Sequence, residues 1–126
     1  MAVPTVLAFN LEVCATALGA LCANLGIRFK PIPRESFSMP LGAMAGMPAR
    51  FPAPSNGENF DAPMLVMCGM EEPTFDAFLK ALRASPIPRI PLKAVLTPTN
   101  AGWNAFRLYE ELSMEHAQMQ RMRNGG

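Results

Sequence analysis

Residues 92–103 read LKAVLTPTNAGW and combine an apolar segment, a polar turn and the start of a helix. The apolar part is typical of a β-strand, and the run of Thr, Pro and Asn that follows it is typical of a sharp turn. Beyond the turn, apolar residues recur at the spacing of one helical face as far as Met119. We therefore expect a strand, a turn, and a last helix from about residue 102 to residue 122.

The chain upstream of this stretch contains the same order of elements twice. Residues 5–10 and 64–68 are short apolar runs, which are typical of strands buried on both faces. A helical stripe follows each run; the first ends at Gly26, suited to a left-handed C-cap, and the second begins at Pro73, suited to a first helical turn. The pattern predicts one domain over 1–126, built from βαβ units at 1–33 and 64–96, a loop at 34–63, and the last helix with its capping turn at 97–122.

Two βαβ units are compatible with two kinds of sheet. One is a ferredoxin-like α+β two-layer sandwich with an extra C-terminal helix, in which the two apolar strands are central and antiparallel. The other is a flavodoxin-like parallel four-stranded α/β sheet. We favour the first, because a duplicated unit builds its pseudo-two-fold symmetry, and because the segment between the second and third strands contains no helix long enough for a parallel crossover. Since the central strands are apolar throughout, the last helix, the middle loop or another copy of the chain must cover the second face.

The composition excludes several classes of protein. Half of the 126 residues are hydrophobic and 17% are charged, so the chain is not disordered. The formal net charge is +1, which provides no field for nucleic acid or an anionic membrane. No signal sequence and no run of the ~20 apolar residues that a membrane helix needs is seen, so we expect a cytoplasmic protein. The three cysteines have no CxxC spacing and are expected to be reduced and buried.

The loop at 34–63 is rich in Pro and Gly, yet it is not polar. Between Ser36 and Gly57 the only charged residue is Arg50. One interpretation is a segment with a short turn of helix that packs on its own domain; the other is a lid or an interface for a homodimer or a protein partner. The candidate interface residues are Met39, Leu41, Met44, Met47 and Phe51.

No motif in the chain specifies a reaction. The sequence has no phosphate-binding glycine loop, zinc-protease motif or nucleophile elbow, and His116 is its only histidine, so we expect no cofactor and no metal and assign no catalytic residue. A small molecule or an anion could bind where the strand meets the last helix. Simple capping of the helix explains the same residues without a ligand and is the interpretation we favour for them. The candidate ligand-binding residues are Thr97, Thr99, Asn100 and Trp103.

Several stretches resemble a bacterial family known as a domain of unknown function, DUF3783. The resemblance is strongest at 92–103, where KAVLTPTN is fairly specific, and at Tyr109 to Leu112 with Glu115 and His116. It extends to 64–69 and 75–79, and more loosely to 40–46 in the middle loop. The resemblance implies a small bacterial, cytosolic protein. It implies no activity, so no catalytic residue follows from it.

Two functional hypotheses remain open. The leading one is a non-catalytic binding or interaction module that self-associates or binds a protein partner through the middle loop and the uncovered sheet face, because that segment is unusually apolar. The alternative is a small-molecule or anion-binding domain, with enzymatic activity left open, whose site is the turn between Thr97 and Trp103.

Overall fold

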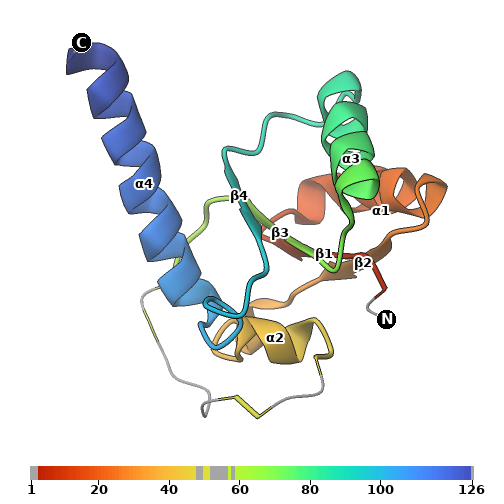
Figure 1. Ribbon diagram of the computed structural model, residues 1–126, viewed down its shortest axis with the longest axis horizontal. Coiled ribbons are helices and arrows are strands. Elements are labelled where there is room, and N and C mark those ends of the chain that lie inside the picture. Colours follow the sequence, from red (N-terminus) through yellow and green to blue (C-terminus); the bar gives the residue numbers. More distant parts are fainter. Residues whose placement is uncertain (1–2, 48–49, 52–56, 58, 126) are drawn as a thin grey trace.

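A computed structural model describes residues 3–47, 50–51, 57 and 59–125, with side chains up to residue 119. Its central feature is a four-stranded sheet with helices on both faces (Figure 1). The elements in chain order are β1 Thr5–Phe9, η1 Glu12–Cys14, α1 Ala15–Asn24, β2 Arg28–Pro31, η2 Arg34–Ser36, α2 Leu41–Met44, β3 Met64–Cys68, α3 Glu72–Ala84, β4 Leu92–Val95 and α4 Ala105–Gly125.

The sheet has the strand order β2-β1-β3-β4. β1 and β3 are central and antiparallel, with Leu7 opposite Val66, and the two outer strands lie at the edges. The expected α+β class is confirmed, and the parallel flavodoxin-like alternative is excluded by the direction of β3. In the split βαβ unit of a ferredoxin-like sandwich, another strand lies between the two parallel strands. Here the two parallel strands of each unit are direct neighbours: β1 pairs with β2, and β3 pairs with β4.

Helices α1 and α3 cover one face of the sheet together (Figure 1). Their buried residues Leu18, Cys22 and Phe78 pack on the side chains that β1 and β3 direct to this face, among them Val6 and Leu65. α1 ends as expected: Gly26 has φ +70°, a conformation that glycine adopts without steric cost. Pro73 lies in the first turn of α3, one residue after the helix begins.

The opposite face is covered by the first turns of α4 and by the described parts of the middle loop at residues 34–63, called the middle segment below. Five aromatic rings join them to the sheet, and the ring of Phe60 stacks on that of Tyr109 with centroids 4.3 Å apart. The last helix and the middle loop therefore both provide the predicted cover, and a second copy is not needed for it. The buried core residues of this face are Leu7, Phe9, Ile32, Phe37, Leu41, Met44, Phe60, Met64, Val66, Cys68, Leu92, Ala105, Phe106 and Leu108.

Asn10 and Lys30 hold the middle segment in place. Asn10 follows β1 with φ 58°, and its Nδ2 donates to the carbonyl oxygens of Phe60 at 2.9 Å and Ala62 at 3.1 Å. Lys30 Nζ donates to the Met44 carbonyl at 2.8 Å, at the C-terminal end of α2, where a helix favours a cation. Within the described residues, no helix is long and apolar enough to cross a membrane.

Candidate functional site

The turn between β4 and α4 is organised by the side chain of Asn100, which is almost fully buried. Its Oδ1 accepts from the Thr97 amide at 2.9 Å, and its Nδ2 donates to the Val95 carbonyl at 3.0 Å. In return, the Asn100 amide donates to Thr97 Oγ1 at 3.2 Å. The side-chain amide of Asn100 thus closes the turn, because its oxygen and its nitrogen both form hydrogen bonds with nearby backbone groups.

The same turn also holds α2. The amides of Leu41 and Gly42, at the start of α2, donate to the carbonyls of Trp103 and Ala101 at 2.8 Å each. These amides have no partner within their own helix, so the turn satisfies them. Residues 97–104 and α2, distant in the sequence, therefore form one hydrogen-bonded unit.

The last helix begins later than the predicted residue 102. Its first residue is Ala105, whose amide donates to the Phe37 carbonyl at 3.1 Å, and Asn104 Oδ1 accepts from the Arg107 amide at 3.0 Å. Asn104 is therefore the capping side chain, not Thr99 or Asn100, because the turn continues for several residues after Asn100.

The four candidate ligand residues are close in sequence but differ in exposure. Thr97 and Thr99 are exposed, Asn100 is buried, and Trp103 is half-buried with the Arg107 guanidinium 4.5 Å from its ring centroid. Structural roles account for every bond of the Asn100 side chain and for the helix amides around it. Ligand binding by Thr97, Thr99, Asn100 and Trp103 stays a prediction.

The five candidate interface residues divide into two groups. Leu41 and Met44 are buried in the core of their own domain, and the ring of Phe51 lies over Gly42, so these three pack inward. Met39 and Met47 are each 39% exposed. The inward packing follows from α2: in this short helix the apolar residues Leu41 and Met44, one turn apart, share the face toward the sheet.

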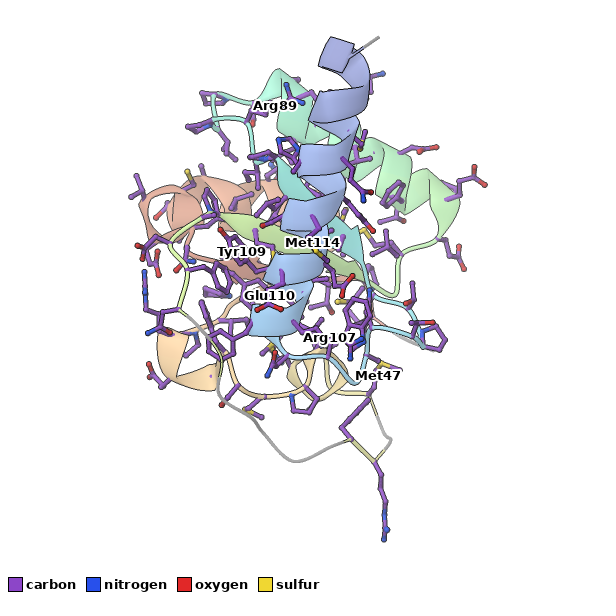
Figure 2. The ribbon with its side chains drawn as sticks, turned by 90° about the vertical axis from the view of Figure 1, so that its left-hand side faces the viewer. Met47, Arg89, Arg107, Tyr109, Glu110 and Met114 are labelled. Carbon is purple, nitrogen blue, oxygen red and sulfur yellow. The ribbon has the colours of Figure 1, made fainter. Side chains whose placement is uncertain are left out.

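The two ends of α4 have very different surroundings. Its first two turns are anchored in the core by Phe106, Leu108 and Leu112. From Met114 to Met119 every side chain except His116 is exposed, and this part of the helix stands apart from the rest of the molecule (Figure 1). Figure 2 shows Glu110 and Met114 on the outward side of the helix.

A cavity of about 530 Å³ lies at the C-terminal end of α3, between this helix and the segment that leads to β4. Its wall includes Leu82 and Ile90, and three cations, Arg83, Arg89 and Lys93, also line it. No motif in the sequence indicates this cavity. Pro86 and Pro88 predict a break after α3, but only the path of residues 85–91 in space decides whether side chains fill the region beneath it.

Two of the three thiols are buried, and the described residues form no cluster of metal ligands. Among these residues, no group of three or more His, Cys, Asp or Glu side chains could hold a metal ion. Burial raises the pKa of the Cys22 thiol to about 11 and that of the Cys68 thiol to about 12, against a usual value of 9.0. Both thiols are therefore protonated at neutral pH, which makes them poor nucleophiles.

The fold and these sites define a small α+β domain with two covered sheet faces, a cavity with a cationic rim and a helix that extends beyond its core. The family model described as "Domain of unknown function (DUF3783)" matches residues 63–119. The match includes β3, α3, β4, the turn and most of α4, and it confirms the resemblance seen in the sequence. No curated protein and no solved structure matches the chain.

Proposed function

We propose that the chain is a non-catalytic interaction module that binds a partner helix through the distal part of α4, the first candidate partner being a second copy of the chain. The observation that carries the proposal is the exposure of Met119, which is 62% exposed on a helix whose first turns are fixed in the core. An exposed apolar side chain on a helix that extends beyond its core is a position that an amphipathic partner helix can cover.

The side of α4 that packs on the core at the start of the helix becomes exposed to solvent farther along it. Leu108, Leu112 and Met119 lie on one side of a helix that has 3.6 residues per turn, and the exposed Glu115 lies on the same side between Leu112 and Met119. Leu108 and Leu112 find their partners in the domain, whereas Met119 does not face the described core. A second helix laid along this side would complete the burial that the domain begins.

The expected association is weak. A contact restricted to a few helical turns buries less than the ~1,200–2,000 Å² of a standard interface. Two copies related by a two-fold axis would each present the same side of α4, which is the commonest way in which identical chains pair. A dimer in the micromolar range is therefore the expected state.

Sedimentation velocity over a range of concentrations tests the proposal with two matched variants. Met119→Glu places a charge on this side of α4 and should raise the dissociation constant of the dimer by about tenfold or more. Met114→Glu makes the same change five residues earlier, about 140° around the helix axis and on the outward side, where the side chain is 57% exposed, and should leave the constant unchanged.

Two results would contradict the proposal. One is a wild-type chain that stays monomeric at every concentration and captures no partner whose binding depends on Met119. The other is an equal effect of the two substitutions, because a general response to added charge would then explain the loss. Circular dichroism of both variants controls for the helix itself.

A further inference from the structure

We propose that the cavity at the C-terminal end of α3 binds a small molecule with an apolar body and a single anionic head, of the class of a medium-chain carboxylate. The inference is independent of the proposed interaction module, because the cavity and the distal part of α4 are different surfaces. It rests on the shape of the cavity, on its apolar wall and on the charges at its rim.

The shape of the cavity comes from an asymmetry between the two βαβ units. In the first unit, α1 is joined to β2 by residues 25–27, with Gly26 in the left-handed conformation that allows a tight turn. In the second unit, residues 85–91 join α3 to β4, and this connection includes Pro86, Pro88 and Pro91. The longer connection stands away from α3, and the cavity of about 530 Å³ lies between them. This volume is in the range of sites for small molecules.

The wall of the cavity is apolar. Ile90 is 3% exposed and belongs to the core beneath α3, and Leu79, Leu82 and Ile87 pack against the same core while remaining partly exposed. These four side chains line the cavity and are its contact with the interior of the domain. An alkyl chain or another apolar body would remove the exposed parts of Leu79, Leu82 and Ile87 from water, which stabilises the bound state by about 25 cal/mol for each Å² of apolar surface buried.

The rim of the cavity is cationic. Arg83 at the end of α3, Arg89 in the connection and Lys93 in β4 line it, and no acidic side chain is among the lining residues in the described part of the chain. Lys93 is held there by a hydrogen bond from its Nζ to the Ile90 carbonyl. Figure 2 shows Arg89 near the top of the view, at the end of the molecule toward which α4 extends.

Two of the cations, Arg89 and Lys93, are close enough to repel each other. The pKa of Lys93 is lowered, first by burial and then by the charge of Arg89. Three lining cations without a lining carboxylate are complementary to an anion, whose charge would relieve the repulsion between Arg89 and Lys93. An arginine guanidinium can hold a carboxylate through two parallel hydrogen bonds, and Lys93 adds a point charge. Since Leu79, Leu82, Ile87 and Ile90 make up much of the lining, a single anionic head on an apolar body fits better than a polyanion.

The test is an NMR titration of the ¹⁵N-labelled full chain with octanoate, and with 1-octanol as the neutral analogue. We expect chemical-shift changes that centre on residues 79–93 for octanoate, and an affinity for 1-octanol that is lower by about tenfold or more. The double variant Arg83→Gln/Arg89→Gln should weaken octanoate binding about tenfold or more, whereas Arg28→Gln, the loss of an exposed arginine in the edge strand β2, should not change it.

Each outcome decides the proposal. Absence of shifts around the cavity at saturating octanoate would overturn it, as would equal affinities of octanoate and 1-octanol, or equal affinities of the double variant and Arg28→Gln. Because both arginines are exposed, the double variant should keep the wild-type spectrum away from the cavity, and that spectrum checks its fold. Octanoate shifts that centre on α4 instead would also count against the cavity.

Discussion

The two faces of the sheet are covered in different ways. On one face, α1 and α3 follow the central strands in sequence, and each presents a repeating apolar stripe to the strands. On the other face, the cover comes from η2, α2, Phe60 and the first turns of α4, which are far apart in the sequence. The first cover is regular and repeated, and the second is assembled from pieces.

The difference shows what an irregular cover needs. A long amphipathic helix satisfies its own backbone and requires only an apolar stripe to hold it on a sheet. Short pieces such as α2 leave amides and carbonyls without helical partners, so side chains and distant carbonyls must satisfy them. On the irregular face, three side chains and two backbone carbonyls provide these hydrogen-bond partners: the side chains of Asn10, Lys30 and Asn100, and the carbonyls of Ala101 and Trp103.

The largest effect is expected from a charge inserted beneath the irregular cover. Met44 is 5% exposed in the core of that face, so Met44→Glu should lower the free energy of unfolding by about 4 kcal/mol or more, because burying an unpaired carboxylate is costly. Urea unfolding followed by circular dichroism measures the loss.

Met47→Glu is the matched control in the same segment. Its side chain is exposed, so the free energy of unfolding should change by less than about 0.5 kcal/mol. Equal and small effects of both substitutions would show that the segment is not packed on the sheet as described.

The two buried thiols report on the two faces separately. Cys22 lies under the regular cover and Cys68 under the irregular one. At pH 8, the raised pKa of Cys22, about 11, makes its thiolate about 100-fold rarer than that of an ordinary thiol, and the pKa of Cys68, about 12, makes that thiolate rarer still. Alkylation followed by mass spectrometry should therefore modify the partly exposed Cys14 first.

Alkylation of the same thiols at increasing urea concentrations tests whether the two covers unfold together. If the sheet and its two covers unfold as one unit, Cys22 and Cys68 become reactive over the same urea range. Earlier labelling of Cys68 would mean that the irregular cover opens alone.

The same shifts predict how stability depends on pH. Because the folded-state pKa values lie above 9.0, the folded protein binds more protons than the unfolded chain between about pH 9 and 12. The contribution of these thiols is thus complete below pH 9 and decreases as the pH rises through this window. Cys22→Ala should reduce the part of the decrease that belongs to Cys22, measured by urea unfolding at pH 8 and pH 10.5.

A smaller effect is expected from Asn100→Ala. The substitution removes the side-chain bonds to the Thr97 amide and the Val95 carbonyl, so the free energy of unfolding should fall by about 1–3 kcal/mol. Thr99→Ala, in the same turn but exposed, should change it by less than about 0.5 kcal/mol. Similar small values for both would contradict the role of Asn100 as the closing residue of the turn.

The smallest expected effects belong to two glycines on the regular face. Gly19 lies inside α1, and a Cβ there would make ordinary contact with the Phe29 ring at 3.5 Å, so Gly19→Ala should stabilise the fold by about 0.5–1 kcal/mol.

Gly26 has φ +70° and no neighbour near the position of a Cβ. Gly26→Ala should therefore destabilise by about 1 kcal/mol through backbone conformation alone. Thermal unfolding of the pair measures opposite shifts; shifts of the same sign would contradict the assignment of helix interior and C-cap.

Sequence reasoning worked well where structure is local. The strand Met64–Cys68, the end of α1 before Gly26, the short helix between Pro40 and Pro48 and the central position of the apolar strands all follow from periodicity and from the known preferences of Gly and Pro. The start of α4 was predicted too early, because Gly102 and Trp103 look like a first turn although the capping residue is Asn104.

The candidate site was harder to predict for a physical reason. Polar residues before a helix suggest either a cap or a ligand site, and only the partners of Asn100 in space distinguish the two. In the middle segment, the spacing of Leu41 and Met44 could not reveal which side faces the sheet, since that depends on where residues 101–103 bind α2.

The sequence was enough to predict the α+β class, the duplicated βαβ order, the apolar central strands and the resemblance to the DUF3783 family, whose model matches residues 63–119. These properties depend on local periodicity and on short motifs. The tertiary structure alone decided the antiparallel pairing of β1 with β3, the cover of the second face, the burial of Met44, the cavity beneath residues 85–91 and the exposure of Met119. Each of these depends on contacts between residues that are far apart in the chain, and no local pattern encodes such contacts.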